Sequence, residues 1–267
     1  MKKVSFLLCF LIISFVGQSQ DLDTLIDLGG HRLHFNITKG KGVPILFESG
    51  GGDDGSVWND LRKNLKDSVG TTLITYDRAG TGKSEIDTSK IDILNEIKDL
   101  EIALKKLGYL KDIFIVAHSL GGSYSTLFCS RNKTIIKGCV FIDINLPCFM
   151  TKQKVREIKA IYTSELPTLK KQKIGIFYLL TNFEKTNDLI RKIAFPASIH
   201  ATIISSDIPP YKGVDSTQWK FCQKQFGKLP NHTYVLAEKC RHYVFIDYPI
   251  LVTDEIIKMY RRRTKKN

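Results

Sequence analysis

Short apolar runs and amphipathic helical stretches alternate along most of this 267-residue chain. Four central runs fit buried strands, because each is short, apolar and bounded by turn-forming residues: 43–47, 71–76, 113–117 and 140–142. Between two of them, apolar residues recur at helical spacing over 93–107, and Gly108 ends that helix. Strands that alternate with helices in this way predict βαβ units, and hence a mostly parallel sheet with helices on both faces.

The ends of the chain extend this pattern to eight strands. An N-terminal hairpin is expected over residues 24–37, with its turn at Gly29 and Gly30. Two further strands and two helices are expected near the C-terminus, at 201–204, 216–226, 233–236 and 249–260. Residues from about 148 to 198 interrupt the alternation, because they are lysine-rich and helical in pattern. We interpret them as a helical lid inserted into one α/β domain that spans residues 20–267.

The first 19 residues have the pattern of a secretory signal peptide. Lys2 and Lys3 precede an almost wholly apolar run over 4–16, and the small residues Gly17 and Ser19 follow it. This predicts cleavage after Ser19 and export to the periplasm or the medium. A retained N-terminal anchor is the alternative, although the run is shorter than the roughly 20 residues that a membrane span needs.

Cleavage would leave five cysteines, and an odd number leaves at least one thiol free. These are Cys129, Cys139, Cys148, Cys222 and Cys240. Their dispersed spacing argues against a zinc site. Cys129 and Cys139 fall in apolar stretches and are expected to be buried. A disulfide between Cys222 and Cys240 is one pairing that the sequence allows.

The formal net charge of +13 arises mainly from scattered lysines. Dispersed positive charge favours solubility and a weak attraction to anionic membrane surfaces. No helix-turn-helix, zinc-finger or aromatic-basic motif accompanies it, so specific nucleic-acid binding is not expected. The sequence leaves the oligomeric state open.

The strongest functional motif is AHSLGG at residues 117–122, directly after an apolar strand and before a helix. A serine on a tight strand-to-helix turn needs small neighbours, so that its hydroxyl stands clear of the backbone. The backbone N–H of Leu120 would then face a developing oxyanion at the start of the helix. The alternative for Ser119 is an ordinary helix N-cap.

Two glycine-containing motifs end the two preceding strands, FESGGG at residues 47–52 and YDRAGTGKS at residues 76–84. With AHSLGG, they make the chain resemble the α/β-hydrolase family, in particular the branch with an LEAG-type loop and a YDRAGxGxS motif. The resemblance extends from about residue 27 to 260 and is weak only over the expected lid. It implies that Ser119 is the nucleophile and that the N–H of Gly51 is the second oxyanion donor. The alternative for residues 50–52 is a flexible turn.

The resemblance also implies a C-terminal histidine as the base, since the family order is serine, acid, histidine. His242 follows the last expected strand in HYVFIDYP at residues 242–249, which is similar to the family's GHYIxxxxPxxV segment. One departure is the pair Cys240 and Arg241, where the family usually has small residues. Arg241 would place a like charge beside the imidazole or crowd the approach to it.

Two aspartates are candidates for the acid. The family usually carries it beyond the seventh strand, where Asp207 lies about two residues early and proline occupies the usual position. Some relatives, such as certain haloalkane dehalogenases, place it at the end of the sixth strand, where Asp143 lies in FIDINLP. We favour Asp143 and keep Asp207 as the alternative. The acid would orient His242 and stabilise its imidazolium form.

These features predict a serine hydrolase that cleaves an acyl bond of a small molecule, with a carboxylic ester as the default. Dehalogenase and epoxide-hydrolase chemistry is disfavoured, because those relatives need an aspartate where Ser119 stands. No metal or organic cofactor is implied. Phe177, Leu179 and Leu180 would give the lid an apolar surface for a hydrophobic substrate group. The alternative from another class is a non-catalytic ligand-binding protein on the same fold.

Overall fold

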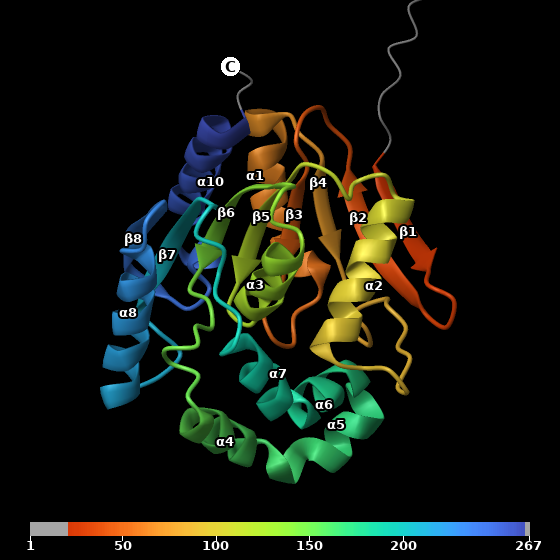
Figure 1. Ribbon diagram of the computed structural model, residues 1–267, viewed down its shortest axis with the longest axis vertical. Coiled ribbons are helices and arrows are strands. Elements are labelled where there is room, and N and C mark those ends of the chain that lie inside the picture. Colours follow the sequence, from red (N-terminus) through yellow and green to blue (C-terminus); the bar gives the residue numbers. More distant parts are fainter. Residues whose placement is uncertain (1–20, 265–267) are drawn as a thin grey trace, which may run out of the picture.

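The computed structural model describes residues 21–264, so the predicted signal peptide lies outside the described residues. Within them the chain forms one eight-stranded sheet with helices on both faces (Figure 1). The strands are β1 Leu22–Asp27, β2 Arg32–Thr38, β3 Ile45–Glu48, β4 Leu73–Tyr76, β5 Ile113–His118, β6 Ile136–Ile142, β7 Ala201–Ile208 and β8 His232–Arg241. The helices are α1 Asn59–Val69, α2 Ile93–Lys106, α3 Gly121–Arg131, α4 Lys152–Ile161, α5 Leu166–Gln172, α6 Ile174–Thr181, α7 Phe183–Ile190, α8 Gly213–Gly227, α9 Val244–Asp247 and α10 Pro249–Thr264, with short 3-10 turns at Gly55–Trp58 and Thr163–Glu165.

The strand order across the sheet is β1-β2-β4-β3-β5-β6-β7-β8. β1 pairs antiparallel with β2, and β2 pairs antiparallel with β4. The pairs from β4 through β8 are parallel. The predicted fold class, a mostly parallel eight-stranded sheet covered on both faces, is therefore confirmed.

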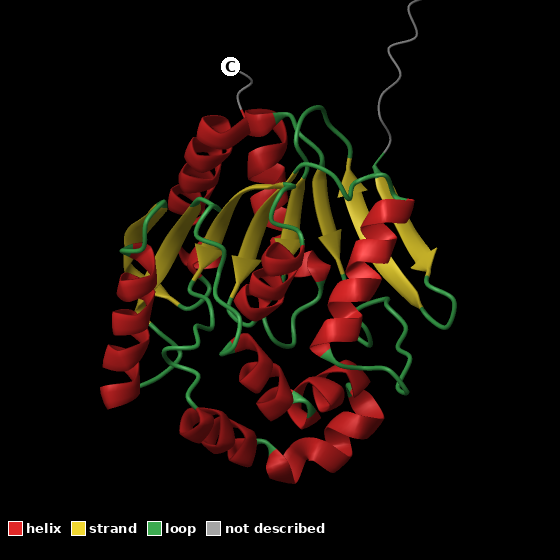
Figure 2. Cartoon of the chain, viewed as in Figure 1, coloured by secondary structure: helices red, strands yellow, loops and turns green. Residues whose placement is uncertain are grey.

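The core consists of two apolar layers, one on each face of the sheet. Figure 2 shows the helices that cover these faces. Side chains of β5 alternate between them, with Ile115 in the layer under α2 and α3 and Val116 in the layer under α1 and α10. This explains why residues 113–117 form a continuous apolar run. Successive strand residues point to opposite faces of the sheet, and both faces are covered. Each fully buried aliphatic side chain contributes about 1.5–3 kcal/mol.

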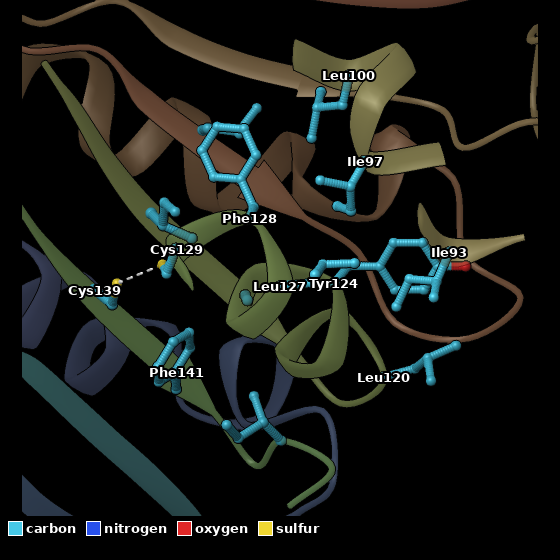
Figure 3. Packing of buried hydrophobic residues seen from close by; sticks show 14 of the residues in the cluster. Ile93, Ile97, Leu100, Leu120, Tyr124, Leu127, Phe128, Cys129, Cys139 and Phe141 are labelled. Carbon is cyan, nitrogen blue, oxygen red and sulfur yellow. Dashed lines mark hydrogen bonds between the residues drawn. The ribbon is translucent and has the colours of Figure 1, made fainter. Parts of the chain in front are cut away.

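Figure 3 shows the first of these layers, where Ile97 and Leu100 of α2 lie near Phe128 of α3. Cys129 and Cys139 are buried here as predicted, with their sulfurs 3.8 Å apart. The disulfide joins Cys148 to Cys222, with 5.6 Å between the Cα atoms. The pairing of Cys222 with Cys240 that the sequence allowed is wrong, because Cys240 is a buried free thiol near the end of β8.

Four helices, α4 to α7, stand between β6 and β7; we call residues 152–190 the helical segment. In Figure 1 it lies beyond the carboxyl ends of the central strands. Gly175 in α6 touches the loop after β4, since its N–H donates to the Gly80 carbonyl at 3.2 Å. A Cβ on Gly175 would lie 2.6 Å from that oxygen, so only glycine permits this approach. The helical segment therefore packs over the carboxyl ends of the strands, where ligands bind in open α/β folds.

Two C-terminal strands are longer than the sequence indicated. β7 continues through the polar residues Ser205 to Asp207 and ends at Ile208, and β8 continues to Arg241. Ser205 and Ser206 are fully buried and pair with β8, which a search for apolar runs does not detect. Within the described residues, no helix combines the length and apolarity that crossing a membrane requires.

Candidate active site

Ser119 lies on the sharp turn between β5 and α3, with a backbone φ of 51°. This left-handed conformation costs a non-glycine residue about 1–2 kcal/mol, so the surrounding packing must hold it. The Ser119 N–H donates to the Ile142 carbonyl at 3.2 Å, and its own carbonyl accepts from Asn145 N–H at 2.9 Å. The strained turn is thus attached to the end of the neighbouring strand β6.

The two glycines after the turn are needed for close packing. A Cβ on Gly121 would lie 2.5 Å from the Glu48 carbonyl oxygen. A Cβ on Gly122 would lie 2.5 Å from the Cβ of Ile144. Contacts this short do not occur in proteins, so the start of α3 reaches β3 and the loop after β6 only because these residues have no side chain.

His242 follows β8 and contacts both Ser119 and Asp143. Its Nε2 lies 2.9 Å from Ser119 Oγ, and its Nδ1 lies 2.7 Å from Asp143 Oδ2. When Nδ1–H donates to the carboxylate, Nε2 remains as an acceptor for the serine hydroxyl. The geometry thus joins a hydroxyl, an imidazole and a carboxylate in one hydrogen-bonded chain.

The Asp143 carboxylate is fully buried and accepts three hydrogen bonds besides the one from His242. Its Oδ1 accepts from Ser206 N–H at 3.0 Å and from Trp219 Nε1–H at 2.9 Å. Its Oδ2 accepts from Ser206 Oγ–H at 2.7 Å. Hydrogen bonds to a charged acceptor are stronger than neutral ones, which lets an ionised carboxylate remain in this buried position.

The structure does not bring Asp207, the other candidate acid, to His242. Asp207 lies inside β7, next to Ser206, and successive strand residues point to opposite sides. Because Ser206 faces Asp143, Asp207 faces away, where its Oδ2 accepts from Lys239 N–H at 3.4 Å and its Oδ1 lies 3.7 Å from Lys220 Nζ.

Gly51 and Leu120 lie beside Ser119 and line the same cavity. In the part of the chain that the structure describes, the backbone N–H of neither residue makes a hydrogen bond. Both amides are therefore available to a ligand. A Cβ on Gly51 would lie 3.4 Å from Leu120 Cδ2, so the two backbone segments are close neighbours.

The loop that carries Gly51 is held by the buried side chain of Arg78, a contact that motif reading did not identify. Its guanidinium donates to the Ser49 carbonyl at 2.7 Å, to the Gly50 carbonyl and to Glu48 Oε1 at 2.7 Å. Burial raises the pKa of Glu48, and the Arg78 charge opposes that rise. Glu48 and Arg78 stand in the FESGGG and YDRAGTGKS motifs, so the signal was present in the sequence.

The cavity next to Ser119 and His242 has a volume of about 340 Å³. Its lining includes residues of the loop after β6, of the helical segment, and of the region before and within α8. The lining side chains are mainly apolar or aromatic, namely Leu120, Met150, Ile158, Tyr162, Ile176, Leu179, Leu180, Phe183, Pro210, Tyr211 and Trp219. Of the expected lid residues, Leu179 and Leu180 line this cavity, whereas Phe177 does not.

Two further hollows in the described part of the chain are lined by residues away from Ser119. One of about 400 Å³ lies where residues 92–94 meet α7, and one of about 180 Å³ lies beside Gly29 and His31. Within the described residues, no group of three or more histidine, cysteine or carboxylate side chains is arranged to hold a metal ion.

The residues that flank His242 stabilise its loop. Arg241 was expected to approach the imidazole, but its guanidinium pairs with Asp247 at 2.7 Å and is largely exposed. His118 is fully buried, and burial lowers the pKa of its imidazole well below the usual value. Its ring lies 4.5 Å from that of His242, and its Nε2 lies 3.2 Å from the His242 carbonyl oxygen. A neutral His118 thus supports the backbone of the histidine loop.

Comparison with known proteins agrees with this architecture. A family model described as alpha/beta hydrolase fold matches residues 43–170. The uncharacterized protein YqjL of Bacillus subtilis is 29% identical over 197 residues, which is 67% of this chain and 77% of that protein. The chain spans less than half of the length of the other curated relatives that it matches.

Solved structures that share this fold include an epoxide hydrolase and an esterase. The epoxide hydrolase VrEH1 from Vigna radiata has a TM-score of 0.69 at 16% identity, over 91% of this chain and 98% of that one. The esterase EaEST from Exiguobacterium antarcticum has a TM-score of 0.66 at 14% identity, over 89% of this chain and 98% of that one. The family model, the sheet order and these likenesses agree: this chain has the α/β-hydrolase fold.

Proposed function

We propose that this chain is a serine hydrolase that cleaves carboxylic esters of uncharged, apolar groups. The observation that carries the proposal is the hydrogen-bonded chain Ser119–His242–Asp143 at the wall of an apolar cavity. Nucleophile, base and orienting carboxylate lie within the hydrogen-bond distances that acyl transfer requires. The esterase among the proteins of similar fold supports the same reaction class.

In this proposal Ser119 Oγ attacks the ester carbonyl while His242 Nε2 accepts the hydroxyl proton. The backbone N–H groups of Gly51 and Leu120 stabilise the oxyanion of the tetrahedral intermediate. His242 then gives the proton to the leaving alkoxide, so that an alcohol departs and an acyl-enzyme remains. Water repeats the sequence and releases the carboxylic acid. Asp143 stabilises the imidazolium and holds the tautomer without taking the proton.

The walls of the cavity support an uncharged substrate. Among the described residues that line it, no aspartate, glutamate, lysine or arginine is present. A charged acyl or alcohol group would lose its hydration there without gaining a partner. We propose that the helical segment acts as the lid of this cavity, since Ile158, Leu179 and Phe183 turn apolar side chains to it.

A fluorophosphonate probe with mass-spectrometric mapping of the modified residue tests the reaction class. We expect one stoichiometric adduct on Ser119, slowed by competing p-nitrophenyl butyrate, and none in Ser119→Ala. If the chain is instead a non-catalytic ligand-binding protein, no adduct is expected at probe concentrations that label known serine esterases. An adduct at another serine would reject the assignment of Ser119.

We also propose export after cleavage near Ser19. The pattern of residues 1–19 and the disulfide between Cys148 and Cys222 support it, because structural disulfides persist in oxidising compartments. N-terminal sequencing of the protein from its native host tests the proposal. A mature chain that begins near Gln20 is expected, and one that keeps Lys2 and Lys3 would refute the cleavage.

A further inference from the structure

One face of α8 is attached to the segment that carries Asp143. Trp219 Nε1–H donates to Asp143 Oδ1 at 2.9 Å, and Gln223 Nε2–H donates to the Ile144 carbonyl at 2.6 Å. Cys222 of the same face forms the disulfide with Cys148. Residues three and four apart share one side of a helix, so these contacts act together. They fix Trp219 relative to Asp143.

Trp219 supplies the one donor to Asp143 that comes from neither β7 nor the histidine loop, as far as the described residues extend. The tryptophan is 1% exposed and the carboxylate is fully buried. Water is therefore excluded from this contact. If the indole N–H were removed, Asp143 Oδ1 would keep only the Ser206 N–H, and the carboxylate would be held less firmly in its orientation toward His242.

We propose that Trp219 is a positioning residue, whose indole N–H holds the Asp143 carboxylate in the orientation that His242 needs. The proposal rests on the proposed function, since it gives the tryptophan a role in the Ser119 reaction. Trp219 acts through Asp143 and does not take part in the proton transfers. This hydrogen bond connects α8 to Asp143, although the two residues are 76 positions apart in the sequence.

The indole also has a second contact surface, which the experiment must separate from the N–H. Its ring lines the cavity, lies 5.0 Å from the ring of Phe149 and packs at 5.4 Å from that of Tyr211. Loss of this wall would change substrate binding and thus KM. Loss of the hydrogen bond would change the rate of the chemical steps and thus kcat. Trp219→Phe keeps an aromatic ring and removes the donor.

The test is a double-mutant cycle of Trp219→Phe and Asp143→Asn with p-nitrophenyl butyrate. We expect Trp219→Phe alone to lower kcat by about 10- to 100-fold, the usual worth of a hydrogen bond to a charged group, with KM changed less than about threefold. In the Asp143→Asn background the same substitution should lower kcat by less than about threefold, because the charge on which it acts is gone. Tyr260→Phe is the matched control, since Tyr260 is also buried, keeps its ring in the variant and loses only a hydroxyl that donates to the Val43 carbonyl.

Three results would overturn the proposal. These are an unchanged kcat, a rise in KM alone, and an equal loss of kcat in both backgrounds, which would indicate a general effect on the fold. Ser119→Ala is assayed alongside. If it keeps full activity the proposed function fails, whereas an inactive Ser119→Ala with an unaffected Trp219→Phe rejects only the role of Trp219.

A second measurement keeps Trp219 in place and therefore covers the case in which Trp219→Phe does not fold. In the Trp58→Phe protein, Trp219 is the remaining tryptophan. Its indole ¹H–¹⁵N signal should move upfield when Asp143→Asn is added, because a hydrogen bond to a carboxylate is replaced by a weaker one. An unmoved signal would show that the indole does not donate to Asp143 and would reject the proposal.

Discussion

Arg78 and Glu48 form an ion pair that is closed off from solvent, with side chains 4% and 3% exposed and 2.7 Å between Nη1 and Oε1. The same guanidinium donates to the Ser49 and Gly50 carbonyls, directly before Gly51. A planar, forked donor can hold several acceptors at once, whereas an ammonium on a flexible stem cannot.

Arg78→Lys should therefore lower kcat for p-nitrophenyl butyrate at least about tenfold and also lower the melting temperature, because the Gly51 loop loses its fixed position while Glu48 stays buried. Arg131→Lys, in an exposed pair with Glu101, is the control and should change neither value appreciably. Wild-type activity in Arg78→Lys would mean that the loop keeps its geometry without the guanidinium.

Ser119→Ala should lower ester hydrolysis by roughly 10⁴-fold or more, as removal of a triad serine does in other enzymes. Ser119→Gly should be equally inactive but more stable than Ser119→Ala by about 1 kcal/mol, since the φ of 51° favours glycine. Steady-state assays and urea unfolding give the two values. A loss of activity below tenfold would mean that another group carries out the chemistry.

Asp143→Asn should lower kcat by roughly 10³- to 10⁴-fold, because the amide favours the wrong tautomer of the imidazole. Asp207→Asn should stay within about tenfold of wild type, since Asp207 lies against Lys239 and Lys220 instead of His242. The two substitutions are nearly isosteric, so each chiefly removes a charge. The reverse ranking would assign the acid to Asp207.

The disulfide should contribute substantially to stability, because it links residues separated by 74 positions, and closing a loop of that size corresponds to roughly 4 kcal/mol in the chain-entropy model. Urea unfolding with and without a dithiol reductant measures this contribution to the free energy of unfolding. The double variant Cys148→Ser, Cys222→Ser should match the reduced wild type and should not respond to the reductant, since Cys129, Cys139 and Cys240 are buried free thiols. A response of the double variant would point to another disulfide.

Glu96 should make stability depend on pH. Its carboxylate accepts a hydrogen bond from the Tyr124 hydroxyl at 2.7 Å. Burial raises the pKa of Glu96 from 4.5 to about 7. Between these values the folded chain keeps a proton that the unfolded chain has lost, so unfolding releases a proton and a rise in pH favours unfolding. The free energy of unfolding should thus fall from about pH 4.5 to 7 relative to that of Glu96→Gln. Parallel pH profiles of the two proteins would contradict this.

The sequence alone predicted the fold class and singled out Ser119 from local patterns, whereas His242 came from the resemblance of residues 242–249 to a segment of the α/β-hydrolase family. Short apolar runs indicate strands buried on both faces, 3.6-residue patterns indicate helices buried on one face, and their alternation identified the mostly parallel sheet. A tight strand-to-helix turn needs small residues next to the serine, so AHSLGG is recognisable without knowledge of distant contacts. Strand ends were less accurate, since the buried serines of β7 are polar.

The tertiary structure alone decided which aspartate lies against His242, which cysteines pair and which donors contact Asp143. His242 and Asp143 are 99 residues apart, and Trp219 and Asp143 are 76 apart. Contacts over such separations depend on the register of β7 against its neighbours and on the packing of α8, neither of which has a local signature. A shift of one residue along β7 would exchange the directions of Ser206 and Asp207. Which aspartate lies against His242 is therefore a property of the assembled sheet, whereas the position of Ser119 is a property of one short segment.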